Sequence, residues 1–426
     1  MTGPMTRPLS RDGALALDRV GALALDHADK LAAFRERFAL PDGIIYLDGN
    51  SLGALPKATP ARLARLIAAE WGQDLIRSWN QHGWIDLPQR VGDKIGRLIG
   101  ARPGEVVAAD STSVNLFKLI AAALHLRPER RVIVSESENF PTDLYVAQGL
   151  IALLGGRHEL RLVTPETLAA ALDDDVALVL LTHVNYRSGR MHDMAAVTRQ
   201  AHDAGALILW DLAHSAGALP VDLAGCDADL AVGCGYKYLN GGPGAPAFLY
   251  VAERLQPEFR SPLTGWLGHA APFAFDPLYR PAPGIASAIV GTPPILSLAA
   301  LEIGIDLALE ADLAAVRAKS LALGRLFAER VAQSCSELGL TLASPAREAE
   351  RGSQICYAHA EGYAVMQALI ARGVIGDFRA PDILRFGFTP LYTSFVDVWD
   401  AVEILCEVLA TREWDRAEFR RRAAVT

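Results

Sequence analysis

The sequence predicts an α/β fold, with a mostly parallel central sheet, helices on both faces of it, and a smaller α+β domain. Short apolar runs, typical of strands buried on both faces, alternate with segments of helical periodicity. Polar side chains follow several of these runs, as expected at the carboxyl edge of a parallel sheet, where ligands bind. The chain has 426 residues, which is long for one core, so a second domain is expected.

The N-terminal third is expected to be largely helical. The first forty residues predict an amphipathic helical segment that ends at the turn Pro41-Asp42-Gly43, and a short strand is predicted over 44–47. Helical periodicity over 60–100 is interrupted between Asn80 and Pro88. Three aromatic or imidazole side chains cluster there, and a packed loop is favoured over an aromatic ligand pocket: Trp79, His82 and Trp84.

The central part predicts five strands, each followed by residues that carry chemistry. Hydroxyl residues before a helix are first of all N-caps, and the same helix start offers amides to an anion. In chain order, the strands and the residues after them are 105–109 with Asp110-Ser111-Thr112-Ser113, 131–135 with Asn139-Phe140-Pro141-Thr142-Asp143, 176–182 with Thr182, 206–210 with Asp211 and His214, and 230–232 with Tyr236-Lys237.

Asp211 and Lys237 form the central pair of the prediction. Alone, an acid at a strand end is more often a cap, and a lysine in a glycine-rich loop is more often a solvated surface residue. Together, at the ends of successive buried strands, they match the needs of pyridoxal 5′-phosphate. A lysine amine forms a Schiff base with its aldehyde, and a carboxylate keeps its ring nitrogen protonated.

The C-terminal part predicts a long helix from about Ile295 to Leu338, broken near Ala311, and then short strands and helices over 340–426. Arg385 stands in an apolar strand, where an unpaired charge is costly. Its partner is either a substrate carboxylate or an internal salt bridge. The expected organisation is an N-terminal segment, 1–59, that contributes to the small domain, a large cofactor-binding domain, 60–295, and a linker helix with the small domain, 296–426.

Composition excludes several classes of protein. A net charge of −8 argues against nucleic-acid and membrane partners, and 51% hydrophobic residues fit a well-packed enzyme. No apolar run is long enough for a transmembrane helix, and no secretory signal is read. The five cysteines form no CxxC pair, so unpaired thiols in a reducing cytoplasm are expected, with no zinc or other metal site.

Eight stretches together resemble kynureninase, a pyridoxal-phosphate enzyme of fold type I, which is aspartate-aminotransferase-like. The resemblance covers nearly the whole chain beyond its first forty residues. DLAH and GYKYLNGGPG are the stretches that separate this family from its aminotransferase relatives. The stretches are YLDGNSLG (46–53), STSVNL (111–116), NFPTD (139–143), WDLAHSAG (210–217), GYKYLNGGPG (235–244), GWLGH (265–269), TPPI (292–295) and LRFGFTPLY (384–392).

The resemblance implies a role for each matching residue. Lys237 would be the Schiff-base lysine and Asp211 the partner of the ring nitrogen. Tyr236 would serve as a phosphate ligand and general acid. The other implied cofactor contacts are Thr112, Ser113, Phe140, Asp143, Thr182 and His214 within the chain, and Trp266 and Thr292 across a homodimer interface. Arg385, with Asn50 and Ser51, would bind the substrate.

The implied reaction is hydrolysis of L-kynurenine to anthranilate and L-alanine in tryptophan catabolism. The family often has Asn where this chain has Thr292, which leaves that phosphate contact open. His82 does not securely match the histidine that some animal members use near the substrate ring. Both kynurenine and 3-hydroxykynurenine therefore remain candidate substrates.

Three other functions fit the sequence less well. A cysteine desulfurase or β-lyase of the same fold needs a reactive cysteine on a mobile loop, but Cys356 lies in a predicted strand. A non-catalytic sensor usually adds a helix-turn-helix domain, for which residues 1–40 are too short and too weakly basic. A dinucleotide-binding oxidoreductase needs a GxGxxG motif after the first strand, and none is present.

Overall fold

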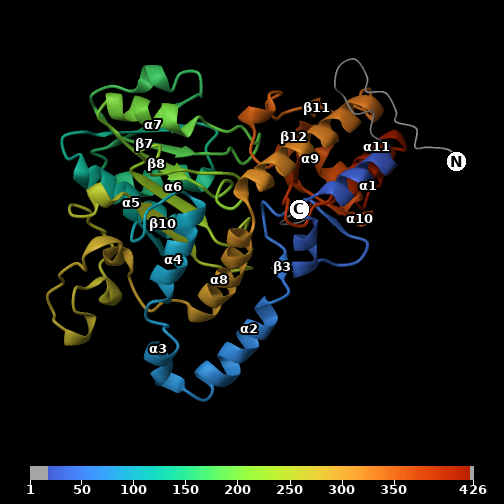
Figure 1. The fold of residues 1–426 in the computed structure, drawn as a ribbon. Helices are drawn as coiled ribbons and strands as arrows, with labels where there is room; N and C mark the ends of the chain where they lie inside the picture. The colour runs from blue at the N-terminus through green and yellow to red at the C-terminus, as the bar shows by residue number, and fades with distance from the viewer. Residues whose placement is uncertain (1–17, 423–426) are drawn as a thin grey trace.

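The computed structural model describes residues 18–422 and is built around a seven-stranded sheet (Figure 1). The strand order is β4-β10-β9-β8-β7-β5-β6, and β10 alone in this sheet runs antiparallel to its neighbours. The mostly parallel sheet is therefore confirmed. The strands are β4 (Val106–Ala108), β5 (Val132–Glu136), β6 (Glu159–Val163), β7 (Val176–Thr182), β8 (Leu207–Asp211), β9 (Leu230–Cys234) and β10 (Ala247–Val251).

Helices cover both faces of this sheet, which explains why every residue of β7, β8 and β9 is buried. One face packs against α5 (Thr112–Leu126) and α6 (Pro141–Leu153). The other packs against α4 (Leu87–Leu98), α7 (Met194–Asp203) and α8 (Ile295–Glu310). The predicted three-layer arrangement is thus observed.

A second sheet lies beside the first and belongs to the C-terminal part of the chain. Its antiparallel order is β11 (Thr341–Leu342), β12 (Gln354–Ala358), β15 (Ile383–Gly387) and β14 (Asp377–Arg379). The helices α9 (Leu313–Ser334), α10 (Gly362–Ala371) and α11 (Phe395–Ala410) pack with it around a separate core. The break predicted near Ala311 is confirmed, because Asp312 caps the start of α9.

The N-terminal segment packs on this C-terminal part. Helix α1 (Arg19–Ala28) lies against α11, as Figure 1 shows in blue and red. Strand β2 (Ile45–Tyr46) pairs with β13 (Val374–Ile375), and β1 (Phe38–Ala39) pairs with β3 (Leu55–Pro56). Of the helical segment predicted for residues 1–40, residues 1–17 lie outside the described part. The domain boundaries 1–59, 60–295 and 296–426 stay a prediction.

Residues 59–98 form an arm of short helices that ends in α4. The expected packed loop is observed, because Trp84 is buried and its indole donates to Glu70 Oε2 (2.9 Å). The helices of the arm are α2 (Thr59–Arg65), a π-helical turn over Leu66–Trp71, a 3₁₀ turn over Leu75–Arg77 and α3 (Ser78–Gln81). Other 3₁₀ turns of the chain are Ala32–Arg37, Ala169–Ala171, Glu253–Leu255, Trp266–Gly268, Pro272–Ala274, Gly284–Ala288, Glu348–Glu350 and Glu413–Asp415.

The expectation of five unpaired cysteines is wrong. Cys335, after α9, and Cys406, on α11, form a disulfide with a Cα–Cα distance of 5.5 Å. They are 71 residues apart, and their pairing depends on the packing of two helices that spacing along the chain does not reveal. Cys226, Cys234 and Cys356 are free thiols.

Within residues 18–422, no helix combines the length and the apolar character needed to cross a membrane.

Candidate active site

A cavity of about 170 Å³ opens at the carboxyl ends of β7, β8 and β9. Parallel strands end there together, and helices α5 and α6 begin there, so side chains distant in sequence converge. The predicted site residues that line it are Thr112, Ser113, Phe140, Asp143, Thr182, Asp211, His214, Tyr236 and Lys237. Thr142, which the sequence placed after a strand without a role of its own, also lines it, and the prediction missed Tyr186, Ala213 and Cys234.

Lys237 and His214 are in direct contact in this cavity. The turn after β9 carries the lysine, whose Nζ lies 3.1 Å from His214 Nε2. His214 is buried, and burial, reinforced by the lysine charge, lowers its pKa well below the usual range. The imidazole is therefore neutral and accepts a hydrogen bond from Lys237.

Two buried carboxyl groups lie beside the lysine. Asp211, at the end of β8, accepts a hydrogen bond from the Ala213 amide (2.7 Å). Asp143, in the first turn of α6, has no hydrogen-bond partner among residues 18–422 for either carboxylate oxygen. Burial raises the pKa of both, the charge of Asp211 raises that of Asp143 further, and the Lys237 charge opposes both rises. An unpaired buried carboxyl group is costly, so this arrangement suits a polar ligand.

The start of α5 provides a site for an anion. Ser111 caps the helix by accepting from the Val114 amide (3.3 Å), and Thr112 and Ser113 line the cavity. A helix N-terminus with exposed amides and hydroxyls favours a phosphate. The N-cap that the sequence predicted is confirmed.

Lys118 is a residue of this region that sequence reasoning missed. It is fully buried on α5, and its Nζ donates to Asp110 Oδ2 (2.5 Å) and to the Ala288 carbonyl (2.8 Å). Asp110 has a positive φ of 51°, a conformation that a non-glycine residue adopts only when its surroundings hold it. The Lys118–Asp110 ion pair thus stabilises the turn that precedes the N-terminus of α5, where an anion would bind. A lysine in an otherwise apolar helical run was the available signal.

Aromatic rings form another part of the cavity. Phe140, just before α6, contacts Tyr186 edge to face with 5.2 Å between ring centroids. Lys237 Nζ lies 6.0 Å from the centroid of Phe140. Thr182 donates a short hydrogen bond to Asn139, the residue before Phe140. A flat ring placed over Lys237 would therefore meet Phe140.

The predicted substrate residues Asn50, Ser51 and Arg385 are brought together next to this cavity. Arg385 donates to Ser51 Oγ (2.6 Å) and to the carbonyl of Tyr186 (2.9 Å), whose side chain lines the cavity. It also forms an internal ion pair with Asp377. The internal salt bridge that the sequence left open is therefore present, and a role toward a substrate stays a prediction.

Trp266 and Thr292 are not brought to the cavity within this chain. Trp266 packs on Phe273 (5.5 Å between centroids) and Phe275 (6.3 Å) and is 44% exposed. Thr292 is exposed in the loop before α8. Their predicted contribution across a dimer interface remains a prediction.

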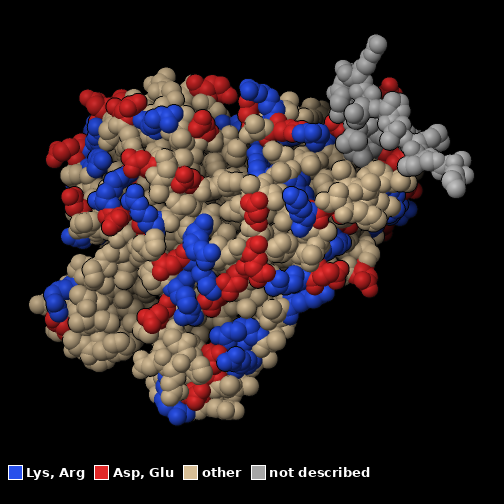
Figure 2. Space-filling model, in the orientation of Figure 1, with Lys and Arg blue, Asp and Glu red and all other residues tan. Residues whose placement is uncertain are grey.

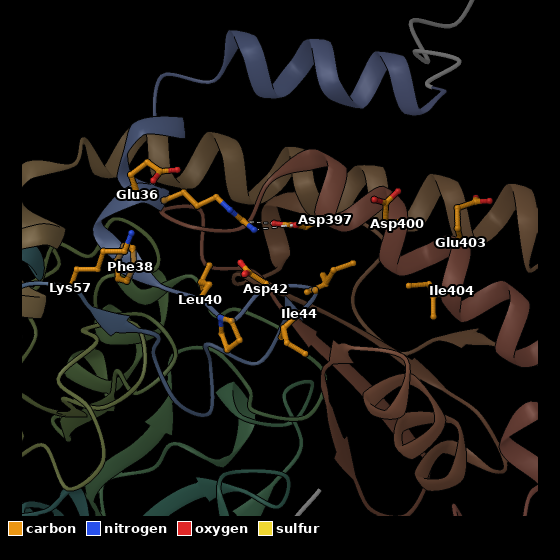
Figure 3. Close-up of a pocket in the computed structure, with 14 residues that line it drawn as sticks. Glu36, Phe38, Leu40, Asp42, Ile44, Lys57, Asp397, Asp400, Glu403 and Ile404 are labelled. Atoms are coloured by element: carbon orange, nitrogen blue, oxygen red, sulfur yellow. Dashed lines mark hydrogen bonds and ion pairs between the residues drawn. The ribbon is translucent and has the colours of Figure 1, made fainter.

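A larger cavity, of about 700 Å³, lies elsewhere, between residues 35–45 and α11 (Figure 3). Its wall carries Asp397, Asp400 and Glu403 on α11 and the ion pair of Arg35 with Asp397 (2.5 Å). None of the predicted site residues lines it. Size alone thus does not identify the chemical site.

Comparison with known proteins yields one family. A family model described as the kynureninase C-terminal domain matches residues 316–405. A kynureninase of Burkholderia pseudomallei (strain 1106a) is 59% identical over 98% of this chain and 100% of its own length. A kynureninase of Pseudomonas fluorescens is 56% identical over the same shares.

Solved structures that are similar to this chain identify its fold. A cysteine desulfurase from Thermococcus onnurineus NA1 superposes with a TM-score of 0.76 at 20% identity, covering 89% of this chain and 98% of its own. A similarity at this identity concerns the fold, which is the pyridoxal-phosphate fold type I predicted from the sequence.

Proposed function

The chain belongs to the kynureninase family, and on that premise we propose that it hydrolyses L-kynurenine to anthranilate and L-alanine, a step of tryptophan catabolism. It is a pyridoxal-phosphate-dependent hydrolase that cleaves a carbon–carbon bond. The observation that carries the proposal is the group of Lys237 with the buried His214 and Asp211 at the carboxyl edge of the sheet. 3-Hydroxykynurenine remains a second candidate substrate.

The donor set of the cavity fits the cofactor. When bound, pyridoxal phosphate supplies an aldehyde for a lysine amine and a protonated ring that withdraws electrons from the substrate. Thr112 and Ser113 at the start of α5 would hold the phosphate, with the Tyr236 hydroxyl beside them. Asp211 would hold the proton on the ring nitrogen, because a neighbouring cation favours its ionised form. The remaining residues proposed to contact the cofactor are Phe140, Asp143, Thr182 and His214.

Lys237 would move the proton at the substrate α-carbon. Its Nζ atom lies 3.1 Å from Nε2 of the neutral His214, which would orient the amine toward the substrate. Arg385, with Asn50 and Ser51, would orient the substrate α-carboxylate through its planar guanidinium. Water then adds to the γ-carbonyl, the Cβ–Cγ bond breaks, and the carbonyl carbon leaves in anthranilate.

Tyr236 would donate the proton that the departing Cβ atom requires. Burial raises its pKa above the usual range, which keeps the phenol protonated at neutral pH, as a general acid requires. Tyr236→Phe should slow bond cleavage far more than it weakens cofactor binding. Equal losses in both would leave Tyr236 with a role in phosphate binding alone.

The experiment that tests the function is an absorbance spectrum of the purified protein, followed by addition of L-kynurenine with anthranilate fluorescence as the readout. We expect a visible cofactor band and anthranilate release, both lost in Lys237→Ala and kept in the exposed control Lys57→Ala. A cofactor band without anthranilate release would mean that the substrate is a compound other than L-kynurenine. No band, even with added pyridoxal phosphate, would contradict the proposal.

A cysteine desulfurase or β-lyase remains the alternative on this fold. Its thiol would have to reach the cavity as a nucleophile, but Cys356 is fully buried in β12 and burial raises its pKa to about 11. Cys234 does line the cavity, and burial raises its pKa as well. If Cys356→Ser hydrolyses kynurenine as fast as the wild type, Cys356 is not a catalytic thiol, and the alternative loses this candidate nucleophile.

We further propose that the enzyme is a homodimer, with Trp266 and Thr292 contributing to the partner's site. The proposed cytoplasmic location no longer has support from unpaired thiols, because Cys335 and Cys406 form a disulfide. Support for the dimer comes from an exposed apolar lobe that contains Trp266 and three large side chains exposed by 63% to 75%: Phe273, Phe275 and Leu278. Figure 2 shows charges of both signs interspersed over this face, whereas the lobe at the lower left, gold in Figure 1, is mostly uncharged. Exposed apolar surface of this kind is typical of an interface.

A further inference from the structure

Two carboxylates and two arginines meet beside the active-site cavity. Asp377 lies directly opposite Arg385 in the antiparallel β14–β15 pair, and the two form a buried ion pair. Arg379 Nη2 contacts Asp377 Oδ2, the oxygen that also pairs with Arg385, at 2.5 Å. Asp48 completes the group, with its Oδ1 3.8 Å from Arg385 Nη2. The four groups are referred to below as the carboxylate–arginine cluster.

Asp48 is held in this cluster by the backbone. It follows β2, forms a bridge with Gly387 at the end of β15, and its carbonyl accepts from the Ser51 amide (2.9 Å). With the Asn50 amide oriented to satisfy its neighbours, Asn50 accepts from Arg385 Nε (3.2 Å) and donates to Asp48 Oδ1 (3.2 Å). The turn Asp48-Gly49-Asn50-Ser51 therefore places three polar side chains, those of Asp48, Asn50 and Ser51, around Arg385.

The groups that face Asp48 come from several elements. They are Asp377 and Arg379 on β14, Arg385 on β15, Ser51 in its own turn, and the phenols of Tyr46, Tyr238 and Tyr392. Burial, then the charge of Asp377, raises the pKa of Asp48 to about 7, and Arg385 opposes this rise. Asp48 therefore titrates near neutral pH.

The charges of the cluster balance only before a substrate carboxylate arrives. With both carboxyl groups ionised, two negative charges face the two guanidinium groups. A carboxylate placed on Arg385 adds a third negative charge within a buried region, where repulsion between like charges is strong. Protonation of one resident carboxyl group restores the balance.

We propose that Asp48 is a positioning residue for Arg385 that gains a proton when the substrate carboxylate binds. The proposal rests on the proposed function, since it requires Arg385 to receive that carboxylate. No bond to carbon changes in this step, and the proton comes from solvent. Affinity for the substrate carboxylate is then highest when Asp48 is already neutral, and it falls as pH rises above the pKa of Asp48 in the free enzyme.

The test uses the holoenzyme and L-kynurenine without its α-amino group, 4-(2-aminophenyl)-4-oxobutanoate. This probe keeps the carboxylate and cannot bond to the cofactor. Calorimetric titration at pH 7.5 in two buffers of different ionisation enthalpy gives the number of protons taken up. We expect at least about half a proton for the wild type, and a Kd about five- to tenfold higher at pH 8 than at pH 6.5, as one coupled proton requires.

Asp48→Asn should abolish both the proton uptake and the change of Kd with pH. Asp306→Asn, a partly exposed carboxylate that pairs with Lys94, is the matched control and should behave as the wild type. Asp377→Asn gives a second test that does not depend on Asp48→Asn folding. Removal of the Asp377 charge lowers the pKa of Asp48, so the rise of Kd should begin at a lower pH.

Equal proton uptake in the wild type and Asp48→Asn would overturn the inference, as would a Kd that does not change with pH in the wild type. An unshifted profile in Asp377→Asn would do the same. Absence of anthranilate from L-kynurenine would instead contradict the proposed function, because that assay does not depend on the proton count.

Discussion

The Nζ atom of Lys237 lies 3.1 Å from Nε2 of His214, although 23 residues separate them in sequence. The lysine follows β9 and the histidine follows β8, and these adjacent parallel strands bring both side chains to one cavity. Because His214 is neutral, it acts as a hydrogen-bond acceptor that orients the lysine amine. Nδ1 of His214 has no partner within the described residues.

This contact predicts that the hydrogen-bonding capacity of residue 214 matters more than its bulk. His214→Phe should lower kcat for anthranilate formation by about tenfold to a hundredfold. This is at or below the lower end of the effect of a lost proton-transfer group, because His214 orients the lysine that moves the proton. His214→Gln, which keeps an acceptor, should lose less. The cofactor band at a fixed enzyme concentration shows whether binding is retained. Equal losses in both variants would mean that the contact has no part in proton transfer.

A second prediction concerns acid stability and His183. Burial, with a smaller contribution from His192, lowers the pKa of His183 to about 3, and its Nδ1 lies 2.8 Å from Ser215 Oγ. The unfolded chain binds this proton near pH 6.5. Its contribution to stability is therefore complete above pH 6.5 and is lost as pH falls from 6.5 toward 3, by about 1.4 kcal/mol between pH 7.5 and 5.5.

Urea unfolding at these two pH values, at one protein concentration, measures the loss. His183→Gln should lose less stability between pH 7.5 and 5.5 than the wild type by about that amount. His27→Gln, at an exposed position on α1, is the control and should match the wild type. The same pH dependence in His183→Gln and the wild type would show that another group is responsible.

Most of the fold and the inner part of the site followed from the sequence. Apolar runs identified β7, β8 and β9, and the residues after them, Thr182, Asp211 and Lys237, do line one cavity. This works because parallel strands end at one edge, so order along the chain becomes proximity in space. The antiparallel direction of β10 was not predicted, because the apolar pattern of a buried strand does not depend on the direction in which the strand runs.

Contacts between distant elements were the part that the sequence did not reveal. The Asp377–Arg385 pair depends on the register of β14 with β15, and the Lys118–Asp110 pair on a turn of positive φ. Neither ion pair produces a periodic pattern in the sequence from which it could be predicted. The disulfide between Cys335 and Cys406 depends likewise on helix packing, and here the expectation was wrong.

The disulfide leads to a third prediction, on the number of reactive thiols. Titration of the unfolded chain with a thiol reagent, without reductant, should give the three free cysteines Cys226, Cys234 and Cys356. Reduction before titration should add Cys335 and Cys406. In the oxidised protein, Cys406→Ser should lower the free energy of unfolding by about 2–4 kcal/mol, since the bond closes a long loop. Five thiols before reduction would restore the original expectation.

The fourth prediction tests whether sites are shared between two chains. Lys237→Ala should give an inactive homodimer, because the lysine is lost. Trp266→Ala should give a weakly active homodimer, because the proposed contact with the partner's site is lost. In a mixed dimer, the site with Lys237 from one chain and Trp266 from the other is intact. Random exchange of equal amounts makes half of the dimers mixed, each with one intact site, so about a quarter of wild-type activity should return.

The control for subunit exchange is a mixture of Lys237→Ala and Asp211→Asn. Both residues line the same cavity of one chain, so every site in the mixed dimer carries one of the two defects and no activity should return. Recovery with Trp266→Ala but not with Asp211→Asn can arise only if Trp266 serves the partner's site. If neither mixture recovers although mixed dimers form, Trp266 acts within its own chain, and the exposed apolar lobe around it needs another explanation.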